Sequence, residues 1–186
     1  MGPPGSAIWS SMLDAAHDIL REQGYSALTS RSIAERIGVK QRLVYYYFHT
    51  MDELVVETFK RGAAAELERL SEALASKYPL KEVWDVCVHT ADTRITSEFM
   101  ALANRNPALR DEVIKHIEAC RRMQVSALSR AMGIKNKNQL TPLAAAIFAT
   151  SAALTLHREA KLGTRMGHAD IMAAIEGFIA RWDTQN

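Results

Sequence analysis

The chain has 186 residues, of which 48% are hydrophobic and 24% charged, a composition that excludes an intrinsically disordered protein. The formal net charge of +2 is too small to indicate a nucleic-acid or membrane partner by itself, so any basic surface must be local. The two cysteines, Cys87 and Cys120, exclude a disulfide framework and fit a reducing cytoplasm. The first residues lack the pattern of a signal peptide, and the uncharged run from Leu140 to Leu156 is too short for a bilayer. We therefore expect a cytoplasmic protein without a membrane partner.

Helical periodicity runs through almost the whole chain, with no sustained strand pattern. The first helices are expected at about 6–23, 30–37 and 41–48, and Gly24 and Gly38 end the first two. Thr50-Met-Asp-Glu53 is a capping box, in which the Thr hydroxyl and the Glu carboxylate bind each other's backbone amides. It predicts the start of a long fourth helix.

Proline positions divide the rest of the chain into long helices. Tyr78-Pro79 ends the fourth helix, and an apolar stripe from Trp84 to Leu102 predicts one helix after it. Pro107 and Pro142 each follow a capping residue and open two further helices. A last helix follows from about residue 169 to residue 182. The sequence predicts an all-α fold of eight or nine helices.

The two short helices carry the residue types that a helix-turn-helix needs. Ala34 lets the helices approach closely, Gly38 permits a left-handed turn, and Val44 packs the second helix onto the first. On a helical wheel, Val44 and Phe48 point inward while Arg42 and Tyr46 point outward. Between residues 31 and 50, four basic residues face one acid, which gives a local charge of +3 typical of a phosphate-binding face.

Here the sequence resembles the tetracycline-repressor (TetR) family of bacterial transcriptional regulators. The resemblance covers about residues 8 to 56 at uninterrupted spacing. It rests on Gly24-Tyr25, Leu28-Thr29, Ile33-Ala34, Gly38-Val39, Val44-Tyr45-Tyr46-Tyr47-Phe48 and Glu53-Leu54. It implies a helix-turn-helix DNA-binding domain at 6–50 and a helical ligand-binding and dimerisation domain at 51–186.

The resemblance also implies roles for individual residues. Residues matching Tyr45 and Tyr47 contact DNA phosphates in the family, although the wheel places Tyr47 nearer the buried side. Arg31, Gln41 and Arg42 are of the types that recognise base edges. The predicted DNA-binding residues are Thr29, Ser30, Arg31, Lys40, Gln41, Arg42, Leu43, Tyr45 and Tyr47.

Three positions depart from the family pattern. The family usually has Ser or Thr at Lys40, a small residue or Thr at Leu43, and Lys at Met51. Losing that Lys removes an expected phosphate contact, for which Lys40 can compensate electrostatically. Leu43 is suited to contact a thymine methyl group, which would alter the preferred operator.

The second half places large apolar and polarizable side chains on helices that surround one interior. Such residues usually form plain core, but the resemblance implies a pocket for a small, largely apolar or aromatic effector. The predicted ligand-binding residues are Trp84, Val88, His89, Phe99, Met100, His116, Met123 and Phe148. Helices at about 141–163 and 169–182 are expected to pair with a second copy in a homodimer.

The sequence gives little support for a catalytic site or a metal site. Cys87 and His89 lie two residues apart on a helix and cannot form a dyad, while His89, Asp92, His116 and His157 show no ligand spacing. We therefore expect no catalytic residue, metal or cofactor. The sequence predicts a ligand-responsive regulator, in first place a repressor, that binds double-stranded operator DNA. A regulator without a small ligand, and an enzyme or carrier that uses the bundle pocket, remain alternatives.

Overall fold

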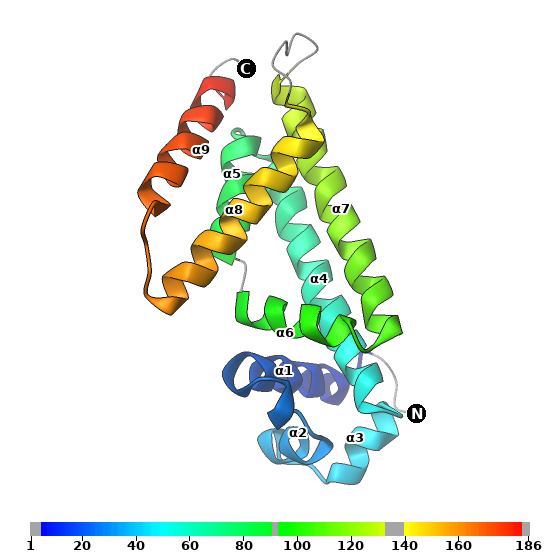
Figure 1. The fold of residues 1–186 in the computed structure, drawn as a ribbon. Helices are drawn as coiled ribbons and strands as arrows, with labels where there is room; N and C mark the ends of the chain where they lie inside the picture. The colour runs from blue at the N-terminus through cyan, green and yellow to red at the C-terminus, as the bar shows by residue number, and fades with distance from the viewer. Residues whose placement is uncertain (1–4, 91–92, 133–139, 184–186) are drawn as a thin grey trace. The chain divides into compact units, whose positions relative to one another are not determined.

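The structure is a computed structural model that describes residues 5–90, 93–132 and 140–183. Over these ranges it contains nine α-helices and no strand, so the all-α prediction is confirmed (Figure 1). The helices are α1 Ala7–Gln23, α2 Ser30–Ile37, α3 Gln41–Tyr47, α4 Met51–Ala75, α5 Pro79–Asp85, α6 Thr93–Ala103, α7 Pro107–Met132, α8 Pro142–Leu162 and α9 His168–Asp183. None of the described helices combines the length and apolar character that crossing a bilayer requires.

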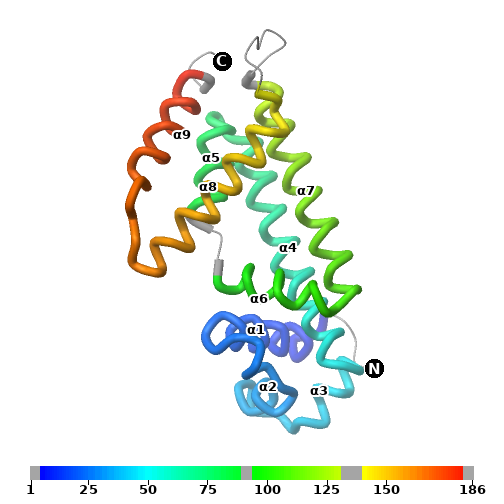
Figure 2. Tube along the Cα trace, viewed as in Figure 1, coloured from blue at the N-terminus to red at the C-terminus, as the bar shows by residue number. Residues whose placement is uncertain are grey.

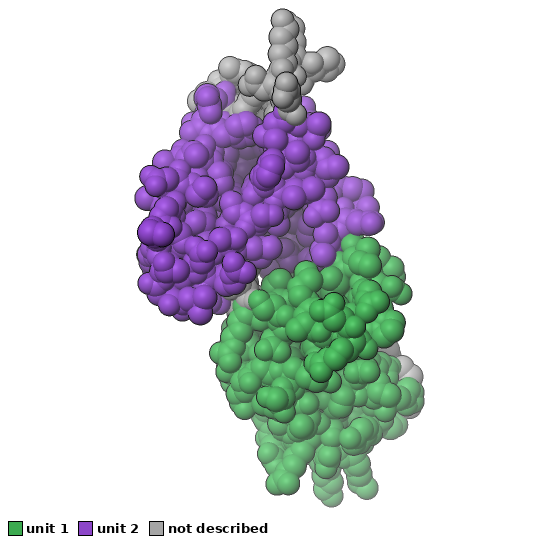
Figure 3. Space-filling model, viewed as in Figure 1, with its two compact units in different colours: residues 1–64, 94–115 green, residues 65–93, 116–186 purple. Residues whose placement is uncertain are grey.

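The chain forms two compact units (Figure 3). Unit 1 comprises Met1–Ala64 and Arg94–Lys115, and unit 2 comprises Ala65–Thr93 and His116–Asn186. The long helices α4 and α7 therefore each supply residues to both units. Helix α6 and the first part of α4 group with the short helices, whereas the expected domain boundary lay at residues 50 and 51. That boundary, as a division of functions, stays a prediction.

Helix α1 forms where the sequence predicts it. The Ser6 hydroxyl caps its first turn by accepting from the Trp9 amide, and the helix ends at Gly24. Its inward face is almost completely buried over Met12, Leu13, Ala15, Ala16, Ile19 and Leu20. Helix α1 packs directly on α2.

Helix α4 begins after Thr50, but its cap differs in one bond from the predicted capping box. The Thr50 hydroxyl accepts from the Glu53 amide at 3.0 Å, as expected. The Glu53 carboxylate instead accepts from the His49 amide at 2.8 Å. Glu53 therefore satisfies a donor one residue before the Thr50 position, and the two side chains still hold the first turn.

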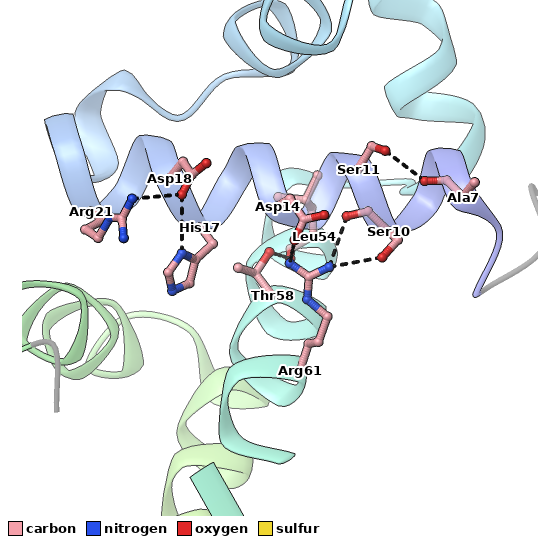
Figure 4. Close-up of polar contacts among 10 residues, drawn as sticks. All are labelled: Ala7, Ser10, Ser11, Asp14, His17, Asp18, Arg21, Leu54, Thr58 and Arg61. Carbon is pink, nitrogen blue, oxygen red and sulfur yellow. Dashed lines mark hydrogen bonds and ion pairs between the residues drawn. The ribbon is translucent and has the colours of Figure 1, made fainter. Parts of the chain in front are cut away.

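Arg61 joins α4 to α1 inside unit 1 (Figure 4). Its guanidinium donates to the Ser10 carbonyl at 3.0 Å and to the Asp14 carboxylate at 2.6 Å. One turn earlier, the buried Thr58 hydroxyl donates to the Leu54 carbonyl at 2.7 Å, so it needs no partner outside its own helix. The Asp14 side chain is 68% exposed, so this pair adds about 0–1 kcal/mol, while the bond to the Ser10 carbonyl sets where the Arg61 side chain lies on α1.

The prediction of one helix from Trp84 to Leu102 is wrong. Helix α5 ends at Asp85, a π-helical turn (η2) covers Val86–Thr90, and α6 begins at Thr93. A π-helical turn adds a residue to the helical repeat, so an apolar stripe drawn at a constant period loses its register there. Trp84 consequently belongs to unit 2, whereas Phe99 belongs to unit 1 and packs edge-on against Phe59.

Unit 2 is built from the later helices together with the ends of α4 and α7. Helix α5 contacts α9, and α8 contacts both η2 and α9. Figure 2 follows the chain from α8 through the turn at Gly163 into α9. Its main buried cluster consists of Leu80, Trp84, Ala127, Ala153, Leu156 and Ile179. The small residues in this cluster leave space between the helices, as shown below.

Gly24 offers a test of the unit 1 fold. Its backbone (φ 82°, ψ 177°) lies in a region that is essentially restricted to glycine, and an added Cβ would lie 3.1 Å from Glu98 Oε1. We expect Gly24→Ala to lower the free energy of unfolding by about 1–3 kcal/mol. Gly62→Ala is the matched control, because Gly62 lies inside α4 with open space around it. It should raise the stability by about 0.5–1 kcal/mol. Urea titrations followed by circular dichroism measure the free energy of unfolding of both variants. If both substitutions raise it, or both lower it, this account is contradicted.

Candidate nucleic-acid interface and ligand cavity

Helices α2 and α3 form a helix-turn-helix inside unit 1. Gly38 ends α2 in the left-handed conformation (φ 70°, ψ 32°), and the next amide, that of Val39, donates to the Ala34 carbonyl at 2.9 Å. Ala34 and Val44 are both almost completely buried where the two helices pack. The three residue types predicted to build this motif therefore occupy the expected positions.

The structure answers which faces of α3 are buried. Val44 and Phe48 are buried, while Arg42 and Tyr46 are exposed, so the helical wheel is confirmed. Phe48 stacks on Trp9 of α1, with ring centroids 6.2 Å apart. This contact fixes the end of α3 against the unit 1 core and leaves its opposite face to solvent.

The consecutive tyrosines divide between solvent and core. Tyr45 is 50% exposed and Tyr46 52%, whereas Tyr47 is 8% exposed. The Tyr47 hydroxyl oxygen accepts from Ser6 at 3.4 Å. Of the two tyrosines that the family resemblance links to phosphates, only Tyr45 presents its ring to solvent.

Ser30 links α2 to both ends of α3. The buried Ser30 hydroxyl donates to the Tyr45 oxygen at 3.0 Å and accepts from the Gln41 side-chain amide at 2.8 Å. Gln41 and Tyr45 are one helical turn apart, so a single hydroxyl orients two side chains on the same exposed face. Ser30 is thus placed to position its neighbours rather than to reach outward itself.

The predicted local charge is smaller than the sequence count indicated. Arg31 pairs with Glu35 at 2.7 Å, and Arg36 pairs with Glu22 of α1 at 2.6 Å. The hydrogen bond from Arg36 lowers the pKa of the Glu22 carboxyl below its usual value. Within the described part of the chain, Lys40 and Arg42 are exposed and form no ion pair. The free positive charge of the motif is therefore concentrated at the start of α3.

The two remaining predicted DNA-binding residues have local roles in the fold. The Thr29 hydroxyl caps α2 by accepting from the Ser32 amide at 3.0 Å. Leu43 is partly buried on α3. Neither observation removes these side chains from the surface, because Thr29 is exposed and part of Leu43 remains accessible.

Unit 2 contains a cavity of about 460 Å³ that is open to solvent. Side chains from α5, η2, α7, α8 and α9 line it, and they are almost all apolar. Its aromatic members are Trp84, Phe148 and Phe178, and its polar members are Cys87 and Gln124. No charged residue belongs to the described lining. Such a surface favours a neutral ligand, because a charged one would lose its hydration without compensation.

The few polar groups of the cavity differ in how they are satisfied. The Gln124 amide donates to Cys87 Sγ at 3.4 Å, and its carbonyl oxygen accepts from Thr150 at 3.3 Å. Burial raises the pKa of the Cys87 thiol to about 11, so this thiol is neutral at physiological pH. The indole Nε1 of Trp84 is buried without a hydrogen-bond partner. This N–H is therefore a buried donor beside the cavity that is left without a partner.

Of the predicted ligand-binding residues, Trp84 and Phe148 line the cavity. Val88 packs beside the cavity wall, while Met123 packs against a neighbouring cluster around Leu70. The side chain of His89 lies outside the described residues.

The other three predicted ligand-binding residues lie apart from the cavity lining. Phe99 and Met100 belong to unit 1, where Phe99 is buried and Met100 is exposed. His116 bonds to Glu66 at 3.1 Å. The lining residues absent from the prediction are mostly small or aliphatic, among them Leu80, Ala127, Ala149 and Ile175. The alanine-rich run 144–146 and 149 of α8 was the available signal, since small residues leave space between helices.

Comparisons with known proteins agree with this architecture. Residues 12–58 match the family model of bacterial regulatory proteins, tetR family. The chain is 28% identical over 74 residues to a fatty acid metabolism regulator protein of Bacillus subtilis (strain 168), which covers 40% of this chain and 38% of that protein. It is 34% identical over 68 residues to the class A tetracycline repressor protein from transposon 1721 of Escherichia coli, which covers 37% and 26%. These matches span well under half of the curated relatives.

A solved structure extends the likeness to nearly the whole fold. A putative transcriptional regulator from Saccharomonospora viridis, in complex with choline, superposes with a TM-score of 0.80 over 92% of this chain and 95% of that one, at 15% identity. At that identity the likeness shows the fold alone. The family model, however, covers the helix-turn-helix itself. Residues 12–58, which include the helix-turn-helix, are thus similar to the DNA-binding segment of bacterial regulatory proteins of the tetR family.

Proposed function

We propose that this protein is a ligand-responsive repressor that binds operator DNA as a homodimer through α3. The observation that carries the proposal is the exposed face of α3, where Lys40, Arg42 and Tyr45 lie together on a helix anchored from behind. Two unpaired cations and a phenol on one face of a helix-turn-helix suit the phosphates and base edges of a major groove. The rest of the motif is nearly neutral, so the attraction is local.

The side chains of this face would divide the work of recognition. Arg42 has the fork that pairs with guanine O6 and N7, and Gln41 can present its amide to adenine. Tyr45 would donate its hydroxyl to a phosphate, which orients α3 without selecting a sequence. Ser30 supports both partners, because its hydroxyl contacts Gln41 and Tyr45 at once.

Dimerisation is proposed through α8 and α9. The outward side of α8 exposes Leu143, Ile147 and Leu154, none of which lines the cavity. On α9 the exposed small residues Ala173 and Gly177 lie one turn apart, which permits close helix approach. Two such helices from each subunit would form a four-helix interface around a twofold axis.

The effector is proposed to occupy the unit 2 cavity. The apolar, partly aromatic lining and the unsatisfied Trp84 N–H select a neutral molecule with one hydrogen-bond acceptor. Choline, which the Saccharomonospora viridis regulator holds, is a cation, and the described lining here has no carboxylate to balance it. The effector would release DNA because it binds better to a conformation whose recognition helices are wrongly spaced for successive major grooves.

The DNA proposal is tested by substitutions on α3. Arg42→Ala should reduce discrimination between operator and random DNA by about 1–3 kcal/mol, because a base contact is lost. Tyr45→Phe should weaken binding to both DNAs together, because the lost contact is to the backbone. Tyr78→Phe is the matched control, since Tyr78 is similarly exposed but lies outside the helix-turn-helix.

Gel shifts with an operator found by selection from random sequences measure all three variants. If Arg42→Ala and Tyr45→Phe bind as the parent protein does, the assignment of α3 as the recognition face fails.

The dimer proposal is tested by one charge on α8. Ile147→Glu would bury a carboxylate in the four-helix interface, so we expect monomers in sedimentation experiments and a loss of operator affinity of tenfold or more. Ile114→Glu is the matched control, because Ile114 is an exposed isoleucine on a helix of unit 1. It should leave the dimer intact. A parent protein that sediments as a monomer at micromolar concentration would refute the interface.

The effector proposal is tested at Trp84. A thermal-shift screen should stabilise the protein with neutral aromatic compounds, more than with choline or phosphorylated metabolites, and the hits should weaken operator binding. Trp84→Phe keeps an aromatic ring but removes the N–H, so affinity for a hit should fall about 3- to 10-fold, the value of one hydrogen bond. DNA binding without ligand should be unchanged. Stabilisation only by charged compounds, or hits that leave the DNA complex intact, would overturn the proposal.

A further inference from the structure

Glu66, His116 and Cys120 bring three metal-ligand types together inside unit 2. Glu66 lies on α4, and His116 and Cys120 lie one turn apart on the same face of α7. All three side chains are partly buried, and their ligand atoms lie within 4.8 Å of one another. None of the three lines the apolar cavity, so the cluster is separate from the proposed effector site.

The distances converge on one atom, the Nε2 of His116. This nitrogen lies 3.1 Å from Glu66 Oε2 and 3.5 Å from Cys120 Sγ. Zinc–nitrogen, zinc–oxygen and zinc–sulfur bonds of about 2.1, 2.1 and 2.3 Å at tetrahedral angles place nitrogen about 3.4 Å from oxygen and about 3.6 Å from sulfur. The observed nitrogen–oxygen and nitrogen–sulfur distances both lie within a few tenths of an ångström of these tetrahedral values. Cys120 Sγ also lies 3.8 Å from His116 Nδ1, to the side of the ring, so the Cys120 side chain must rotate toward the Nε2 end of the ring for the three groups to share one ion.

The surroundings also favour a cation. Within the described residues, no lysine or arginine pairs with Glu66, whose only ion-pair partner is His116. The Glu66 side chain is 41% exposed, which leaves an entry path and room for a water molecule in the fourth position. The donor set of one thiolate, one imidazole and one carboxylate suits a borderline ion better than Mg²⁺ or Ca²⁺, which prefer oxygen.

We propose that Glu66, His116 and Cys120 bind one Zn²⁺ ion per chain, with a water or other small ligand completing a tetrahedral site. Binding releases the thiol proton of Cys120, and the proton that His116 Nε2 shares with Glu66 moves to Nδ1 or to solvent, which frees both atoms to coordinate the ion. The ion would clamp α4 to α7 within unit 2. This site does not depend on the effector or on DNA, because its residues take part in neither surface.

The test uses untagged protein freed of metal by a chelator. Co²⁺ serves as the probe, since tetrahedral cobalt with a thiolate ligand shows a sulfur-to-metal charge-transfer band and intense visible bands. We expect one Co²⁺ per chain by titration, displacement of the cobalt by one equivalent of Zn²⁺, and a rise in melting temperature with Zn²⁺.

Variants separate this site from adventitious binding. Cys120→Ser should abolish the charge-transfer band, and Glu66→Gln should weaken Zn²⁺ binding at least tenfold while keeping a hydrogen bond to His116. Cys87→Ser removes the only other thiol and should leave band and stoichiometry unchanged. A parent protein without a 1:1 cobalt complex, a band that survives Cys120→Ser, or equal losses with Cys87→Ser would each overturn the assignment. Circular dichroism confirms that each variant is folded.

Discussion

The attachment of α4 to α1 is the interaction on which the geometry of unit 1 depends. Arg61 reaches from α4 to the Ser10 carbonyl and the Asp14 carboxylate of α1 (Figure 4). Helix α1 packs on α2, and α2 packs on α3. A rotation or tilt of the first part of α4 cannot leave α3 in place without breaking charged hydrogen bonds or opening a packed core, both of which cost free energy. The exposed face of α3 thus follows α4.

A second contact ties α6 to the same helices. The Glu98 carboxylate accepts from the Tyr25 amide at 3.2 Å, directly after α1 ends at Gly24. A side chain at that position is strained, because φ is +82° and a Cβ on Gly24 would lie 3.1 Å from the same carboxylate. The chain passes between the two units at three places: within α4, at the start of α6 and within α7. These are the covalent routes available to any coupling between the effector and DNA.

The sequence predicted best those features that local chemistry decides. Caps such as Ser6, left-handed glycines such as Gly38 and helix-opening prolines act within a few residues, so α1, α2 and α8 begin and end as expected. The inward positions of Val44 and Phe48 followed from a helical wheel for the same reason. The resemblance over residues 8 to 56 supplied the remainder of this part.

The cavity could not be predicted in this way, because it depends on which helices meet. A constant apolar period assigned Phe99 and Trp84 to one helix face, but the π-helical turn at Val86–Thr90 separates them into different units. The charge of the basic patch also depends on which helices meet. Glu22 of α1 pairs with Arg36, and a count of charges within the motif alone does not include Glu22. The predicted ligand-binding residues were mostly large, whereas small lining residues such as Ala127 and Ala149 leave the space for the cavity.

Helix α4 gives these separate observations a common physical basis. Over residues 58–66 it carries the internal bond of Thr58, the clamp of Arg61 to α1 and the Glu66 carboxylate that faces α7. A continuous hydrogen-bonded helix resists bending between these points, since any kink would interrupt its backbone ladder. An ion or effector in unit 2 can still change DNA affinity only as far as it binds two arrangements of α4 unequally. A strongly bound ligand with equal affinity for both arrangements would stabilise the protein and regulate nothing, so thermal stabilisation and release from DNA are separate measurements of one site.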